Sequence, residues 1–192
     1  MANKMDGFQR IEAKTREEWH QWLEDNHSNS PGIWLIYYKK GSGKPTVSYE
    51  EAVEEALSFG WIDSKVNAID EERYMQIFTP RKTGSIWSKL NKQRIKNLME
   101  NGLMMPAGLE KVEVAKKDGS WYFLDDIEKM IIPPDLKEAL DSNVIAKNNF
   151  EAFGDSSKKQ ILYWIKTAKR EITRKNRIEK VVILAAENKK PF

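Results

Sequence analysis

The sequence predicts an α+β fold, in which a small, mostly antiparallel sheet with flanking helices is followed by a C-terminal helical module. Two short runs rich in β-branched and aromatic residues, 33–38 and 73–79, have the composition of strands, and both lie in the first half of the chain. Apolar residues recur at helical spacing around them and through the last third. Pro133 and Pro134 interrupt these patterns. We therefore expect an α+β domain over residues 1–126, a linker over 127–135 and a helical domain over 136–192.

The first expected elements are a helix and a buried strand. Thr15 and Glu18 have the spacing of a capping box, which predicts the start of a short amphipathic helix. Turn-forming residues up to Pro31 should end that helix and its loop. The run 33–38 is short, β-branched and aromatic, so it should be an interior strand.

A second capping box, formed by Ser48 and Glu51, predicts another helix, which Gly60 should end. The run 73–79 alternates as in a strand of an antiparallel sheet, until Pro80 stops it. The remaining expected elements of this domain are a strand over 61–66 and helices over about 85–102 and 106–117.

Three helical patterns follow the two prolines. Ile161 and Ile165 share a stripe in the second pattern, as do Ile178 and Val182 in the third. The three expected helices cover residues 136–153, 157–169 and 173–188.

Composition excludes several kinds of site. The 192 residues contain no cysteine, which removes disulfides, thiolate metal sites and a cysteine nucleophile. The two histidines, His20 and His27, have no carboxylates at ligand spacing, so we expect neither a metal site nor a cofactor. The apolar runs are too short to cross a bilayer and the N-terminus lacks the pattern of a secretory signal. We therefore expect a cytosolic protein with no membrane insertion.

Unusual polar residues are densest among the aromatics between residues 61 and 91. Arg81 stands between a strand end and a helix start, where anion sites commonly form. Its guanidinium could hold a carboxylate or phosphate, with Asp63 as its partner or as a base. Alternatively, Arg81 and Asp63 form an ion pair that only ties strand to helix. The candidate ligand-binding residues are Asp63, Arg81, Ser85, Trp87 and Asn91.

Positive charge is concentrated at the C-terminus. Residues 156–192 contain eleven Lys or Arg against three Glu, so this segment carries +8 and the rest of the chain −5. Such a segment suggests an anionic ligand, a protein partner or an internal docking surface; alternatively, it is a solvated helix. Nucleic acid is not expected, because the overall charge of +3 is low for a dedicated binder. The cations that we expect to be exposed for an anionic partner are Lys158, Lys159, Arg170, Arg174 and Arg177.

Several segments resemble a known family. They include Phe59-Gly60-Trp61-Ile62-Asp63-Ser64, Phe78-Thr79-Pro80-Arg81, Ser85-Ile86-Trp87 and Tyr163-Trp164-Ile165. Through these segments, which occur in order along nearly the whole chain, the sequence resembles the YdeI/OmpD-associated family, also called bacteriocin-protection proteins. The piece from about Leu136 resembles the small helical domain that defines the family.

The resemblance implies a binding or stress-protection protein, including protection against antimicrobial peptides, and it supplies no catalytic residues. The alternative is a small enzyme or anionic-ligand receptor. That alternative requires a particular set of side chains to converge in one pocket. The set is Asp63, Arg81, Ser85 and Asn91.

Overall fold

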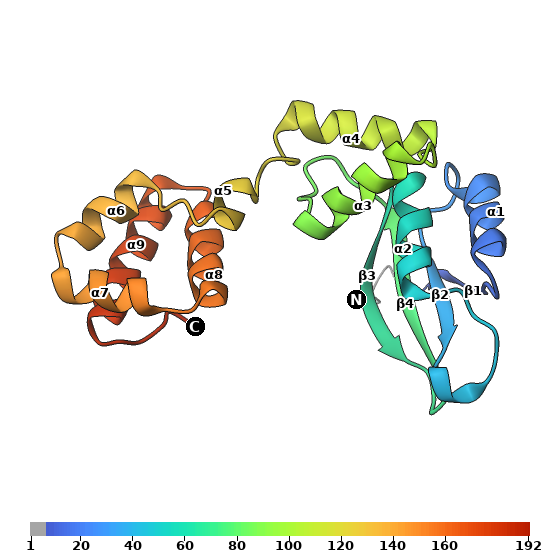
Figure 1. The fold of residues 1–192 in the computed structure, drawn as a ribbon, viewed down its shortest axis with the longest axis horizontal. Helices are drawn as coiled ribbons and strands as arrows, with labels where there is room; N and C mark the ends of the chain where they lie inside the picture. The colour runs from blue at the N-terminus through green and yellow to red at the C-terminus, as the bar shows by residue number, and fades with distance from the viewer. Residues whose placement is uncertain (1–6) are drawn as a thin grey trace. The chain divides into compact units, whose positions relative to one another are not determined.

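The computed structural model describes residues 7–192 and confirms the α+β class. The chain divides into two compact units between Tyr122 and Phe123, each with its own elements (Figure 1). The expected linker over 127–135 contains ordered structure. Helix α5 (Asp125–Glu128) extends into it, and Ile127 is buried in the core of the second unit.

The first unit is built on a four-stranded sheet with the order β1-β2-β4-β3. Strand β2 is interior, as predicted, and pairs antiparallel with β4, which pairs antiparallel with β3. Strand β1, which was not predicted, pairs parallel with β2. Its four residues are exposed or half-buried, so they carry no apolar alternation that would reveal it. The strands are β1 (Gln9–Glu12), β2 (Ile33–Tyr38), β3 (Trp61–Ala68) and β4 (Arg73–Pro80).

Both predicted helix starts in the first part of this unit are observed. The Thr15 side chain accepts a hydrogen bond from the Glu18 amide, and Ser48 forms a complete capping box with Glu51. The next helix begins at Lys89 and not near Ser85, because Ser88 is its cap. The elements are α1 (Arg16–Asn26), η2 (Lys40–Ser42), α2 (Tyr49–Ser58), α3 (Lys89–Glu100) and α4 (Pro106–Asp118).

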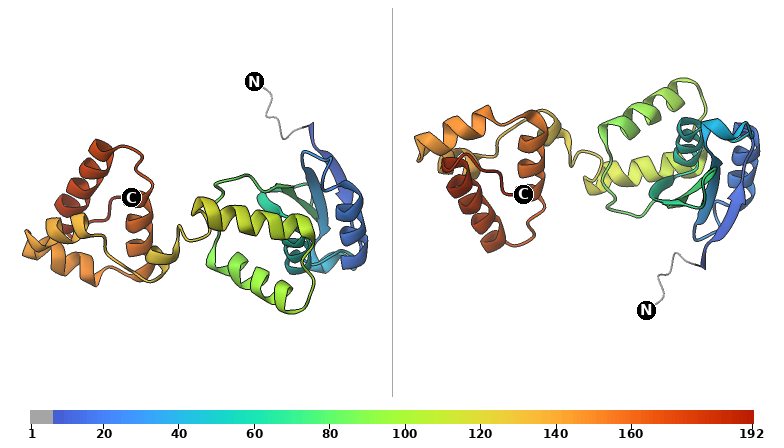
Figure 2. Two further views of the ribbon diagram at one scale, coloured as in Figure 1. Left: turned by 90° about the horizontal axis from the view of Figure 1, so that it is seen from above. Right: turned by 90° about the horizontal axis from the view of Figure 1, so that it is seen from below.

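Helices α1 to α4 all contribute to one core on one face of the sheet. Trp19, Trp61 and Trp87 are fully buried in it. Helices α2, α3 and α4 lie close together in both views of Figure 2. A side chain at Gly108 would place its Cβ 2.1 Å from the Ser58 carbonyl oxygen, so glycine is required for α4 to approach the end of α2.

The second unit consists of helices only. The pattern over 136–153 forms two helices, because Asn143 accepts a hydrogen bond from the Ala146 amide and so begins a new one. Pro133 and Pro134 occupy the cap and first position of α6, where a missing N–H costs nothing. After α5 come α6 (Pro134–Asp141), α7 (Val144–Ala152), α8 (Asp155–Lys166) and α9 (Glu171–Ala186).

Candidate anion site around Arg81

Arg81 directly follows the last residue of β4 and is held by the backbone. Its amide donates a hydrogen bond to the Gly60 carbonyl oxygen at 2.9 Å, which continues the pairing of β3 with β4 by one step. The residue is only 4% exposed. The end of β4 therefore places the charged side chain of Arg81 in the interior of the first unit.

The guanidinium of Arg81 has few partners. Its central carbon lies 3.6 Å from the centroid of the Trp87 ring, in a cation–π arrangement. Nη2 donates one long hydrogen bond to the Ile86 carbonyl oxygen, at 3.4 Å. Nε is buried and has no hydrogen-bond partner among residues 7–192. The donors of this cation are therefore largely unused.

The predicted ion pair between Arg81 and Asp63 is not formed. Asp63 is paired with Phe78 across the strands, and Arg81 lies beyond the end of β4. The Oδ2 atom of Asp63 instead accepts hydrogen bonds from Gln76 Nε2 at 2.7 Å and from the Tyr49 hydroxyl at 3.2 Å. Gln76 sits within the strand next to Asp63, so it reaches the carboxylate more directly than the arginine does.

Burial lowers the pKa of Arg81 to about 10, while the more distant charge of Asp63 acts in the opposite direction. The guanidinium is therefore charged at neutral pH. A buried cation without a contacting anion is destabilising, because the protein replaces its hydration only in part. The stacking on Trp87 offsets some of that cost.

A small cavity of about 10 Å³ lies at this point, lined by residues from the β4–α3 loop and from the end of α4. Asp118 is turned toward the backbone, accepting from the Gly84 amide at 2.9 Å and the Ser120 amide at 2.8 Å. The Ser120 hydroxyl lies beside Asp118 and lowers the pKa of that carboxyl, yet its oxygen is buried without a well-aligned hydrogen bond. The lining includes Arg81, Ser85, Trp87, Asp118 and Ser120.

Three of the five predicted ligand residues therefore line one cavity: Arg81, Ser85 and Trp87. Asn91 belongs to a different polar group, in which its Oδ1 accepts from Arg94 Nη1 at 3.1 Å. Asp63 is also absent from the lining. The set that an enzyme would need does not converge.

Asp118 and Ser120 were not foreseen as parts of the site. Asp118 ends α4 and Ser120 follows it, more than thirty residues after Arg81, and the sequence marks that place only by the helix-ending Gly119. Tyr37 was also missed, because it reads as a core residue of a strand. Its ring stacks on Tyr74 at 4.9 Å, its hydroxyl has no partner within the part of the chain that is described, and burial raises its pKa.

The predicted basic face of the C-terminal module is not free. Both Nε and Nη2 of Arg174 bind the Asp135 carboxylate, at 2.6 and 2.9 Å. Arg177 donates to the Trp164 carbonyl oxygen and to the Thr167 hydroxyl. Lys159 pairs with Glu128 at 2.6 Å.

The expectation that these three cations are largely exposed for a partner is therefore wrong. Cations on α8 and α9 reach the carbonyl groups and carboxylates of neighbouring helices, which helix spacing alone does not reveal. Arg170 is exposed and Lys158 is half-buried. Neither forms an ion pair with any residue from 7 to 192.

Residues 7–192 contain no group of three or more histidines and carboxylates that could hold a metal ion. No helix within that range is long and apolar enough to cross a membrane.

The fold and the site define a two-unit α+β protein with a buried, sparsely bonded arginine in its first unit. The chain belongs to the family described as a domain of unknown function (DUF8412), whose model matches residues 11–111, more than half of its length. A second family model, described as bacteriocin-protection, YdeI or OmpD-associated, matches residues 129–188 and confirms the predicted resemblance for the helical unit. No curated protein and no solved structure matches the chain.

Proposed function

We propose that this chain is a binding protein without turnover, and that its first unit takes up a small anion at Arg81. The observation that carries the proposal is the buried guanidinium, which has one long hydrogen bond, a free Nε and no ion-pair partner in the described part of the chain. An anion in the adjoining cavity would compensate the charge and use the free donors.

The size of the cavity restricts the ligand. A space of about 10 Å³ accepts one water-sized body, which suits a halide ion or the end of a carboxylate. A phosphate is larger and carries more charge than this single arginine would balance. The ligand class is therefore a small monovalent anion, free or at the end of a larger molecule.

The rival proposal, a small enzyme, has less support. Asp63, the candidate base, binds Gln76 and Tyr49 and does not line the cavity. Asp118, the carboxylate that does line it, is held by two backbone amides. A general base has to reach the proton that it removes, and neither group is placed for that role beside Arg81.

The matched family model on the second unit is described as bacteriocin-protection. We extend that role to this chain as part of the proposal, with protection arising from binding and not from a reaction. Arg81, Ser85 and Trp87 line the cavity, whereas Asp63 and Asn91 do not. The cavity thus has the cation that binding requires but not the full set of polar side chains expected for an enzyme.

A thermal-unfolding titration tests the anion site. Sodium chloride, bromide, formate and acetate are compared at constant ionic strength, for the native chain and for Arg81→Met. The native chain should gain stability with a saturable dependence, about 2.7 kcal/mol when the anion is at a hundred times its Kd. Arg81→Met should lose that gain. Without added anion, it should keep or slightly raise the free energy of unfolding, because it removes an unpaired buried charge.

The matched control is Lys65→Met, which removes an exposed cation from β3 in the same unit. It should leave both the basal stability and the anion response unchanged. An anion response that persists in Arg81→Met would refute the site. So would a native chain that responds to no anion, in which case a water molecule occupies the cavity.

A further inference from the structure

Helix α9 presents an exposed face with apolar ends. Ile172 and Ile183 are each 61% exposed, unlike the buried Ile178 between them. They are eleven residues apart, about three helical turns, so they lie on the same side of the helix. Glu179 falls between them on this side and Lys175 lies next to it. Exposed apolar side chains that occur singly are common on protein surfaces, so the two isoleucines alone do not mark an interface; the charges between them and the adjoining groove carry the argument.

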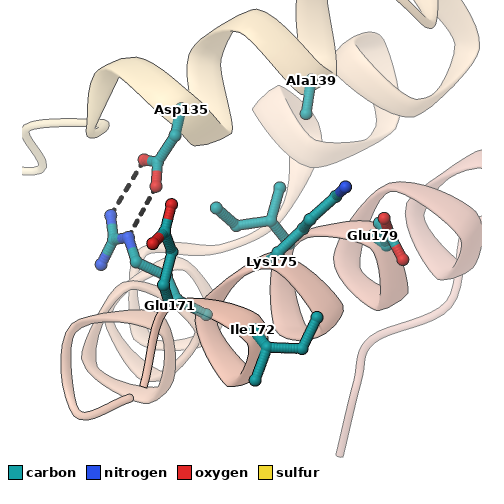
Figure 3. A pocket seen from close by; sticks show the side chains of 8 residues that line it. Asp135, Ala139, Glu171, Ile172, Lys175 and Glu179 are labelled. Atoms are coloured by element: carbon teal, nitrogen blue, oxygen red, sulfur yellow. Dashed lines mark hydrogen bonds and ion pairs between the residues drawn. The ribbon is translucent and has the colours of Figure 1, made fainter. Parts of the chain in front are cut away.

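The charges on this face are unused. Lys175 and Glu179 are exposed, and neither forms an ion pair with any of the described residues. They differ in this from Arg174, which is bound to Asp135 on α6. In Figure 3, Lys175 and Glu179 extend from α9 with no bond drawn to another of the residues shown.

A groove of about 640 Å³ runs beside this face, between α6 and α9. Ala139 from α6 and Ile178 from α9 contribute apolar lining to it. Ile172, Lys175 and Glu179 also line this groove, so the exposed face of α9 forms one of its walls. Such a surface can pack against a copy of itself about a two-fold axis.

The charged residues on this face of α9 are also complementary to those of a second, antiparallel copy of the helix. When two copies of one helix pack antiparallel, residues equidistant from a common midpoint face each other. The midpoint of Ile172 and Ile183 and that of Lys175 and Glu179 both fall at or beside Arg177. One two-fold axis there would set each isoleucine against the other isoleucine of the second copy, and each Lys175 against Glu179, twice over.

We infer that this face of α9, with the adjoining groove, is an isologous interface between two copies of the chain. The occupant is a second copy because the apolar and charged positions complement themselves about a single axis, which a generic partner would not require. A contact one helix wide is smaller than a standard stable interface, so the dimer forms in a concentration-dependent manner.

Sedimentation velocity of the full chain, from about 10 μM to about 1 mM, tests this inference. The native chain should shift toward a dimer as its concentration rises. Lys175→Glu and Glu179→Lys should each remain monomeric, because like charges then face each other twice. An equimolar mixture of the two variants, and the double variant, should dimerise again, since both restore opposite charges. Ile172→Ser should weaken the dimer about tenfold or more.

Lys129→Glu and Glu151→Lys are the controls, since both residues are exposed and lie outside the groove. They should dimerise as the native chain does. Circular dichroism should show every variant folded, because the replaced side chains are exposed. A native chain that stays monomeric throughout, or single charge variants that dimerise normally, would overturn the inference. So would a failure of the mixed variants to associate.

Discussion

At the scale of single residues, Arg81 is the decisive group of the candidate site: its guanidinium is buried against Trp87 and donates one long hydrogen bond, to the Ile86 carbonyl oxygen. The position of Arg81 between a strand and a helix is readable in the sequence, and its contact with Trp87 follows from their closeness in the chain. Its lack of an ion pair is not readable, because the strand register decides which side chain reaches Asp63. Gln76 holds that carboxylate, and the register of β3 on β4 shifts between Asp63 and Val66, which the alternation of the strands does not reveal.

In the C-terminal unit, Arg174 illustrates the same limit. Helical spacing predicts that it lies on a basic face, yet only the packing of α9 against α6 sets its guanidinium against Asp135. The hydrogen bonds from Arg174 hold the pKa of Asp135 below its usual range. The pair therefore contributes stability above the pKa of the unfolded carboxyl, near 4, and loses it as the pH falls through the lower folded value.

Asp135→Asn tests that contribution. At pH 7 it should lower the free energy of unfolding of the second unit by about 1 kcal/mol or less, since the pair is partly exposed. The difference from the native chain should shrink as the pH falls below about 4, because the native carboxyl is then protonated too. Trp164 is the one tryptophan after residue 122, so its indole N–H signal in NMR reports on this unit. A difference that stays constant from pH 7 to pH 2 would contradict the assignment.

At the scale of elements, local capping signals predict where helices begin, and tertiary contacts set the rest. Ser48 and Glu51 mark the start of α2 in sequence and in structure. The start of α3 is displaced to Lys89, after Trp87 has entered the core. Strand β1 carries no pattern of its own and exists only because β2 offers it a paired edge. Elements of this kind cannot be read from local periodicity.

The packing of α4 against α2 gives a prediction at this scale. Gly108→Ala would place a methyl group 2.1 Å from the Ser58 carbonyl oxygen, so the two helices must separate. The free energy of unfolding should fall by about 1–3 kcal/mol, measured by urea denaturation. Because α4 carries Asp118 at its end, the separation should also weaken the anion response at Arg81.

Gly102→Ala is a control that tests strain without a steric clash, because Gly102 has a positive φ but nothing within 4 Å of an added Cβ. It should reduce stability through backbone strain alone and leave the anion response intact. Equal loss of the anion response in both variants would show that the α2–α4 contact has no particular role in forming the site.

At the scale of the whole molecule, the described residues form three groups of core residues: a main and a smaller one in the first unit, and one in the second. The proline pair led to a sequence-based boundary after residue 126, whereas the structural division falls after Tyr122. The reason lies in α5 and Ile127, which pack into the core of the second unit and make the proline pair a helix start. A pair of prolines therefore indicates that a domain boundary is near, but it does not give the residue at which the two units divide.

Limited digestion with chymotrypsin tests this division. Tyr122 is exposed and stands at the boundary between the units, so it should be the preferred early cleavage site. The expected products are fragments 1–122 and 123–192, identified by mass spectrometry. Early cleavage at the buried Phe150 or Phe153 instead would show that the second unit is not a stable body.

If the buried guanidinium of Arg81 binds a small anion, NMR of arginine side chains will detect the binding at the cation itself. The Nε–Hε signal of Arg81, assigned by its loss in Arg81→Met, is followed while sodium chloride or sodium formate replaces sodium sulfate at constant ionic strength. We predict a large, saturable shift of this signal, while those of the ion-paired Arg73 and Arg174 stay in place. An Arg81 signal that does not move, or that moves only in parallel with the exposed arginines, would contradict the account.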